Sequence, residues 1–210
     1  MKCVHKVWLP DEEEEIAKFL RAEQDADGVG LYQHHKMQSA LSHCTQFRTA
    51  IDVGSHVGTW SMRLAKRFER VFAFEPIERH RECFALNAPS VALLPYALGD
   101  KDATVKLAKG VKSTGDTCIA QDGEYSAEVK RLDDFQIENV DFIKMDCEGY
   151  ELFVCRGGEQ TIRKCHPVII VEQKPGKAKS YGLGDTEAVK WLESIGYKLK
   201  GVIAGDYILA

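Results

Sequence analysis

Hydrophobic and polar positions change their spacing several times along the chain, and these changes predict alternating strands and helices. Short runs rich in β-branched, aromatic and aliphatic residues occupy 49–53, 71–74 and 91–94. Between them, residues 59–68 and 78–87 carry apolar side chains at helical spacing. Alternation of this kind predicts a parallel sheet covered by helices on both faces.

The alternation resumes in the last third of the chain. Two strand-like runs close the sequence, joined by Ala204-Gly205-Asp206. Such a hairpin on a parallel sheet predicts one antiparallel edge strand. We therefore expect a single α/β domain with a mostly parallel seven-stranded sheet and a C-terminal antiparallel hairpin. The elements predicted here are strands at 141–145, 168–171, 197–203 and 207–209, and helices at 150–165, interrupted at Gly157-Gly158, and at 186–195.

Two segments depart from this alternation. Residues 1–45 predict a helical extension packed on the main domain, which we place at 46–210. Its first helix is expected to begin at Leu9-Pro10-Asp11, because proline and acidic residues favour a first helical turn. A second helix is expected over 32–44. Residues 96–131 predict a β-rich insertion, too short for its own core, which opens with a hairpin turning at 99–102.

Composition and charge are those of an ordinary soluble domain. The 210 residues are 44% hydrophobic and 29% charged, with a formal net charge of -4, so nucleic acid is not favoured as a partner. No apolar run is long enough to span a membrane, and the N-terminus lacks the apolar core of a signal peptide. We therefore expect a cytoplasmic location. Seven scattered cysteines without a C-x-x-C pair predict reduced thiols rather than disulfides or a zinc site.

The strongest chemical signal is a glycine-rich turn, Asp52-x-Gly54-x-x-x-Gly58, between the strand at 49–53 and the next helix. Gly54 and Gly58 would let backbone and ligand approach closely, and the N–H groups at the start of that helix can bind a carboxylate or hydroxyl. Dinucleotide-binding turns have the pattern G-x-G-x-x-G, which is missing here. The spacing favours a ligand without a diphosphate, namely S-adenosylmethionine. Taken alone, the turn also fits a tight strand-to-helix connection in any α/β protein.

A second signal follows about 20 residues later. Glu75 ends the next strand, where an acidic side chain would bind both ribose hydroxyls of such a cofactor, and Pro76 stops the strand. Gln33 precedes the first strand and is a candidate for the methionine end of the cofactor. The predicted cofactor-binding residues are Asp52, Gly54, Ser55, His56, Gly58, Thr59, Glu75, Pro76, Ala97, Leu98, Asp146 and Gln33.

A third segment resembles a known family. Residues 140–151, VDFIKMDCEGYE, resemble the K-[IV]-D-x-E-G-x-E signature of the FkbM family of methyltransferases. The stretches 129–135, 156–158 and 167–172 are also similar to that family, in the same order. The resemblance runs from about residue 50 to residue 172, and one departure is Met145, where the family prefers a branched residue.

The resemblance implies a Rossmann-like class I methyltransferase that uses S-adenosylmethionine and releases S-adenosylhomocysteine. It further implies an O-methyltransferase, since relatives with a known acceptor commonly methylate hydroxyl groups of sugars or polyketide-like compounds. The expected partner is therefore a small-molecule or glycan acceptor. The acceptor's identity and the oligomeric state are left open.

A hydroxyl acceptor must lose its proton as it attacks, so a carboxylate or histidine should lie near the transferred methyl group. Asp146 and Glu148, after the strand at 141–145, are the first candidates for a base or an orienting group. Glu151 follows them, although it could instead bind free N–H groups at the next helix start. His56 could face the acceptor or cover a helix start. The carboxylates could also hold Mg²⁺, but the signature does not require it and no metal is expected.

Lysines 174, 177 and 179 follow the strand at 168–171 and would form either a cationic lid over an anionic acceptor or a solvated loop. Alternative functions remain at this stage. They are a methyltransferase acting on nucleic acid or protein, a nicotinamide-dependent oxidoreductase, and a non-catalytic binding module that retains the fold.

Overall fold

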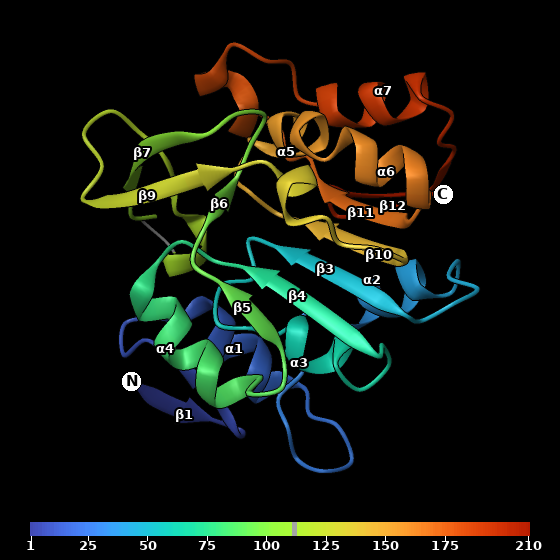
Figure 1. The fold of residues 1–210 in the computed structure, drawn as a ribbon. Helices are drawn as coiled ribbons and strands as arrows, with labels where there is room; N and C mark the ends of the chain where they lie inside the picture. The colour runs from blue at the N-terminus through green and yellow to red at the C-terminus, as the bar shows by residue number, and fades with distance from the viewer. Residues whose placement is uncertain (111–112) are drawn as a thin grey trace.

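Among residues 1–110 and 113–210, the part of the chain that the computed structural model describes, seven strands form the central sheet. Most neighbouring strands pair in parallel, as the alternating pattern predicts (Figure 1). From one edge to the other, the strands are β12 (Leu199–Ile203), β13 (Asp206–Leu209), β11 (Val168–Glu172), β10 (Val140–Met145), β3 (Thr49–Val53), β4 (Arg70–Phe74) and β5 (Ala92–Leu94).

The C-terminal hairpin is inserted differently from the prediction. Strand β13 is antiparallel to both β11 and β12 and lies between them, so the antiparallel strand is not at the edge. Burial explains this order. Ile208 and Leu209 of β13 are both fully buried and point to opposite faces, whereas Leu199 and Val202 of β12 are about half exposed. A strand that is apolar on both faces is stable between two other strands with helices over both faces, as β13 is. The half-exposed β12 can form the edge of the sheet.

Helices cover both faces of the sheet (Figure 1). The alternation of side chains along β3 divides the core, since Ile51 and Val53 pack against one helical layer and Ala50 against the other. One layer contains α5 (Glu151–Gly157), α6 (Glu159–Cys165) and α7 (Glu187–Ser194). The other contains α2 (His34–Leu41), the short α3 (Ser61–Leu64) and α4 (Glu78–Asn87).

The N-terminal extension does not begin with a helix, which corrects the prediction. It begins with a hairpin of β1 (Lys2–Val4) and β2 (Val7–Leu9), and α1 (Glu15–Ala22) starts five residues after Pro10. The turn residues His5 and Lys6 have φ of 45° and 64°, a conformation usually signalled by Asn-Gly or Asp-Gly. His-Lys carries no such signal, so the sequence pattern missed the hairpin.

The insertion forms a separate, smaller sheet of β6 (Ala97–Leu98), β9 (Tyr125–Lys130), β7 (Ala103–Ala108) and β8 (Cys118–Ile119), in that order. The expected hairpin across residues 99–102 is wrong, because β9 lies between β6 and β7. Gly99 permits this pairing: its N–H donates to the Lys130 carbonyl, and a Cβ there would lie 2.7 Å from Val129.

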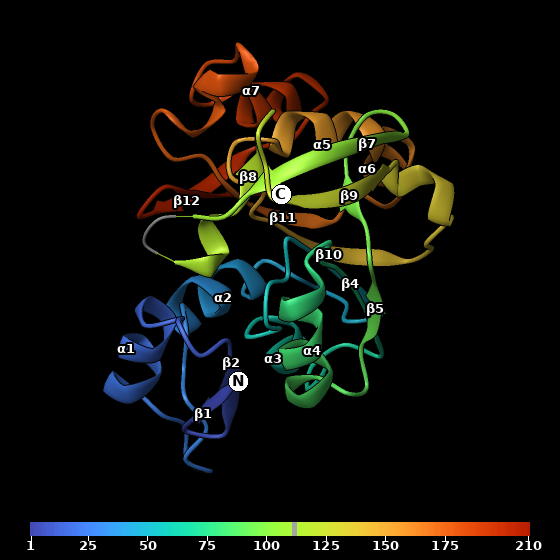
Figure 2. The same ribbon diagram turned by 90° about the vertical axis from the view of Figure 1, so that its left-hand side faces the viewer.

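The insertion and the N-terminal segment approach each other on one side of the molecule (Figure 2). A 3₁₀ turn over Thr114–Asp116 connects them, since Ser113 and Thr114 donate hydrogen bonds to Glu13. Within the described residues, no helix is both long and apolar enough to cross a membrane.

Candidate active site

Two adjoining cavities lie where β3, β4 and β10 end. The first is lined mainly by apolar side chains, among them three from the insertion: Leu98, Leu107 and Ile119. The second is more polar and includes Lys144 and Glu172. The walls of both contain Gly54, His56, Gly115, Asp146 and Glu148.

Most of the predicted cofactor residues line these cavities. Asp52 and Gly58 lie behind the walls, as described below. Gly54, His56, Glu75, Pro76, Ala97, Leu98 and Asp146 line the first cavity, and Gln33, Ser55 and Thr59 line the second. Of the insertion, Ala97 and Leu98 were predicted to line the site, but Leu107 and Ile119 were not, because strand pairing inside the insertion was predicted wrongly.

The glycine turn brings the backbone of β3 against the end of β10. Gly54 has a φ of 70°, and a Cβ at this position would lie 1.9 Å from the Asp146 carbonyl oxygen. Gly58 has a φ of 84°, but its missing Cβ leaves room for the ring of Phe84 in α4 rather than for a ligand. Gly54 therefore serves the close approach at the site, and Gly58 serves helix packing.

Lys144, which was not among the predicted site residues, lines the second cavity. Its Nζ lies 3.5 Å from Asp52 Oδ1 and 3.6 Å from Asp146 Oδ2, and it donates to the Gly54 carbonyl at 3.1 Å. Asp52 is fully buried and also accepts from Ser61 Oγ at 2.7 Å. Burial lowers the pKa of Lys144, but the charges of the Asp146 and Asp52 carboxylates raise it by more. The pKa of Lys144 therefore lies well above its usual range. The sequence could have indicated this contact, because Lys144 lies two residues before Asp146 and side chains two residues apart on an extended chain point to the same face.

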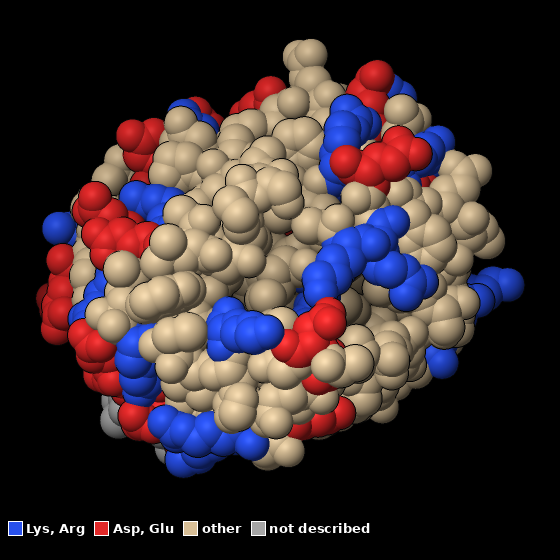
Figure 3. All heavy atoms as spheres, turned by 90° about the horizontal axis from the view of Figure 1, so that it is seen from below, with Lys and Arg blue, Asp and Glu red and all other residues tan. Residues whose placement is uncertain are grey.

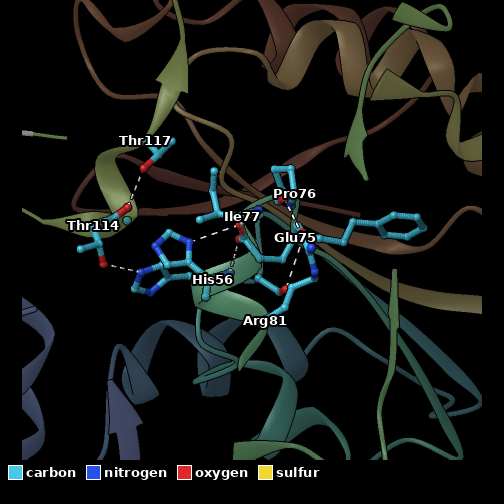
Figure 4. A network of polar contacts seen from close by, with 12 residues as sticks. His56, Glu75, Pro76, Ile77, Arg81, Thr114 and Thr117 are labelled. Atoms are coloured by element: carbon cyan, nitrogen blue, oxygen red, sulfur yellow. Dashed lines mark hydrogen bonds and ion pairs between the residues drawn. The ribbon is translucent and has the colours of Figure 1, made fainter. Parts of the chain in front are cut away.

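Glu75 is anchored at the end of β4 by the protein itself (Figure 4). Its carboxylate accepts hydrogen bonds from the backbone N–H of His56 and of Ile77, both at 2.8 Å, and lies 3.2 Å from His80 Nδ1. Burial raises the pKa of Glu75, but the hydrogen bond from His80 and its charge outweigh burial and leave the pKa below its usual value. Glu75 is therefore an ionised acceptor in the wall of the first cavity.

His56 lies between the two cavities with its backbone in the left-handed region, at a φ of 50°. Its Nε2 is 2.8 Å from Thr114 Oγ1 (Figure 4). Its ring meets the ring of His80 edge to face. Burial, followed by the neighbouring His80, lowers the pKa of His56 well below its usual value. A neutral imidazole with one nitrogen already bonded suits ligand binding better than proton abstraction.

Three carboxylates meet in the second cavity. Asp146, Glu148 and Glu172 bring one oxygen each to within 4.8 Å of one another. Burial and the charge of Asp146 raise the pKa of Glu148, and the same two causes raise that of Glu172 to about 8. Glu172 belongs to β11, so its proximity to Asp146 depends on the pairing of β10 with β11.

Each of these carboxylates has a lysine beside it. Lys144 pairs with Asp146, Lys177 with Glu148 and Lys174 with Glu172. The lysines supply the positive charge that a metal ion would otherwise provide to such a cluster. Of the three loop lysines considered from the sequence, Lys174 and Lys177 contact the site, whereas Lys179 is exposed.

The two remaining candidates hold neighbouring segments in place. Glu151 is fully buried, and its carboxylate accepts from the N–H groups of Cys147 and Gly149 and from Gln173 Nε2. It thus stabilises the loop that carries Asp146. The N–H groups that it binds precede α5, so they are not the N–H groups of the helix start considered as its alternative role. Gln33 has its amide oxygen 2.9 Å from Trp60 Nε1 while it lines the second cavity.

Comparison with known proteins gives the fold and the family. The chain is similar to the crystal structure of methyltransferase FkbM from Methylobacillus flagellatus KT, with a TM-score of 0.51, 18% identity and coverage of 78% of this chain. The chain spans only 43% of that protein's length. It is also similar to the ribosomal protein L11 methylase of Lactobacillus delbrueckii subsp. bulgaricus, with a TM-score of 0.52, 12% identity and coverage of 83% of this chain and 75% of that one.

A third similar structure is the N-methyltransferase NodS from Bradyrhizobium japonicum WM9 in complex with S-adenosylhomocysteine. Its TM-score is 0.50 at 11% identity, with 85% of this chain and 83% of that chain covered. No curated protein matches the chain. The methyltransferase FkbM domain model matches residues 52–199, which include the glycine turn, Glu75 and the three clustered carboxylates. The chain therefore belongs to the FkbM methyltransferase family.

Proposed function

We propose that this protein is an S-adenosylmethionine-dependent O-methyltransferase that acts on a hydroxyl group of a small molecule or sugar. The observation that carries the proposal is the junction of the two cavities. An apolar cavity containing the ionised Glu75 shares Gly54 and Asp146 in its wall with a polar cavity rich in carboxylates. One cavity suits an adenosyl group, and the other suits a polar acceptor.

The residues of the first cavity fit the adenosyl part of this cofactor. Leu98, Leu107 and Ile119 offer apolar surface to a base, and Glu75 has acceptor capacity for ribose hydroxyls. The turn at Gly54 lacks the glycine pattern that binds a diphosphate. The cofactor supplies an electrophilic methyl group when bound.

Asp146 is our candidate for the residue that receives the acceptor's proton. It lines both cavities, and its carboxylate forms an ion pair with Lys144. The bound cofactor would supply the methyl group and leave as the thioether, and Asp146 would take the proton that the acceptor hydroxyl loses. Most of the acceleration comes from holding the acceptor oxygen in line, about 3 Å from the methyl carbon.

The rate of methyl transfer should rise with pH around the pKa of about 8 that burial and Asp146 give to Glu172. Below that pH Glu172 is neutral. Above it, the ionised Glu172 can only accept hydrogen bonds, so it can hold the acceptor hydroxyl with its oxygen free to attack. Initial rates from pH 6 to 9.5 test this, with Glu172→Gln as the matched variant. The same pH midpoint in wild type and Glu172→Gln would contradict it.

A small acceptor is also supported by surface charge. On the face seen from below in Figure 3, Lys and Arg side chains lie among Asp and Glu around a largely uncharged centre and form no continuous basic area. A nucleic-acid substrate would favour a continuous basic surface beside the site. The second cavity contains Glu15, Asp116, Asp146, Glu148 and Glu172 against Lys144 and Lys174, so acidic side chains outnumber basic ones and do not favour a phosphate backbone.

Calorimetric titration is the direct test of the cofactor. S-adenosylhomocysteine and S-adenosylmethionine should bind at one site, whereas NAD⁺ should not. The protein should then transfer a labelled methyl group to members of a panel of sugars and small hydroxyl compounds rather than to RNA, DNA or protein. Binding of NAD⁺ without binding of either adenosyl compound would disprove the proposal.

A further inference from the structure

A buried chain of hydrogen bonds links the N-terminal segment to the glycine turn. Glu13 is fully buried and accepts at Oε2 from Ser113 Oγ at 2.8 Å, and from the N–H and the Oγ1 hydroxyl of Thr114, both at 2.7 Å. Thr114 Oγ1 in turn lies 2.8 Å from His56 Nε2. Glu13 lies outside the 52–199 range that the family model matches, so this part of the site comes from the extension.

The direction of each hydrogen bond follows from the charge of Glu13. Burial raises the pKa of Glu13, but the hydrogen bonds from Ile16 and Thr114 outweigh it and lower the pKa, so the carboxylate is ionised. An ionised carboxylate only accepts hydrogen bonds. The Thr114 hydroxyl therefore donates to Glu13, and its oxygen accepts from His56. For that bond to form, His56 must carry its proton on Nε2.

The other ring nitrogen is then an acceptor. His56 Nδ1 is buried and has no hydrogen-bond partner among residues 1–110 and 113–210. An unpaired buried acceptor costs free energy unless a ligand supplies the donor. His56 lines both cavities, and its own backbone N–H bonds to Glu75, the residue assigned to the ribose. A ribose hydroxyl bound at Glu75 is therefore the donor that we assign to Nδ1.

We propose that Glu13 and Thr114 are positioning residues that hold His56 in its neutral Nε2–H form, so that Nδ1 accepts a hydrogen bond from a ribose hydroxyl of the cofactor. The part that concerns the ribose rests on the proposed function. The part that concerns the tautomer does not, because it follows from contacts within the protein. The N-terminal segment and the insertion together complete the cofactor site.

Nitrogen-15 NMR of the imidazole rings in the full chain tests both parts. His56 signals are assigned by their loss in His56→Asn, since asparagine tolerates the left-handed backbone. In the free wild-type protein near pH 7, Nε2 should resonate as a protonated nitrogen and Nδ1 as an unprotonated one. Adding S-adenosylhomocysteine should shift Nδ1 toward the values of a hydrogen-bonded acceptor and leave Nε2 protonated.

Two substitutions at Thr114 provide the matched pair. Thr114→Val keeps the shape but removes the hydroxyl, so the tautomers should mix and S-adenosylhomocysteine should bind about fivefold more weakly. Thr114→Ser keeps the hydroxyl and should stay within about twofold of wild type in affinity. Glu13→Gln should also reduce the Nε2–H fraction, because its amide can donate to Thr114 and reverse the bond to His56.

Several results would overturn the proposal. A wild-type His56 protonated on Nδ1, or equal tautomer populations in Thr114→Val and wild type, would refute the positioning role. An Nδ1 signal that does not move when S-adenosylhomocysteine binds would refute the ribose contact. If the compound does not bind at all, the proposed function fails instead, while the spectrum of the free protein still decides the tautomer.

Discussion

Replacing Glu75 with glutamine should weaken the binding of S-adenosylhomocysteine by about 100-fold. The wild-type carboxylate is an acceptor at both oxygens, for the N–H groups of His56 and Ile77 and for His80. A glutamine must present an NH₂ group to one of these donors, which disturbs the turn, and it also loses the charge-assisted bonds to ribose hydroxyls. Calorimetry well below the unfolding temperature measures the loss.

The matched control is Glu78→Gln. Glu78 is exposed at the start of α4, three residues after Glu75. This change removes the same charge from the same neighbourhood without touching the cavity, so affinity should stay within about twofold of wild type. Equal affinities for the two variants would show that long-range charge, rather than the contacts of Glu75, governs binding.

The second large effect is expected from Gly54→Ala. The left-handed φ of 70° costs an alanine about 1 kcal/mol. Its Cβ would also lie 1.9 Å from the Asp146 carbonyl oxygen, a backbone atom that cannot rotate away. Separating β3 from β10 to relieve this contact breaks core packing, so the free energy of unfolding should fall by roughly 3–5 kcal/mol. Urea unfolding followed by circular dichroism measures it.

Gly28→Ala separates the two causes. Gly28 has nearly the same φ, 73°, but a Cβ there meets no atom within 4 Å. Its cost should therefore be the conformational part alone, about 1 kcal/mol. A loss of stability as large in Gly28→Ala as in Gly54→Ala would mean that the close approach to Asp146 contributes nothing.

Much of the site could be predicted because its signals are local. The glycine turn, Glu75 and the segment from Lys144 to Glu151 each lie at a strand end, and the carboxyl ends of parallel strands converge on one edge. That rule brings Gly54, Glu75 and Asp146 to the first cavity, as expected. His56 lies within this turn, between Gly54 and Gly58, and all three residues have a left-handed backbone.

Other parts depend on contacts between distant residues. Glu13 and Thr114 are 101 positions apart, and Glu172 reaches Asp146 only through the pairing of two strands. The N-terminal hairpin and the order of strands in the insertion were missed for a related reason. The N-terminal turn lacks the residues that signal a hairpin, whereas residues 99–102 carry turn residues although β6 and β7 both pair with β9. Which strands pair depends on what each one buries.

The sequence by itself determined the class of fold, the strand ends that carry the chemistry and the family. Periodicity and turn chemistry are properties of neighbouring residues, so they can be recognised without a structure. The tertiary structure alone decided that β13 lies inside the sheet and that Lys144 joins two carboxylates. It also decided that Glu13 of the extension binds Thr114 of the insertion, which in turn contacts His56. These features arise from burial and from hydrogen-bond partners supplied by remote segments, which leave no periodic trace along the chain.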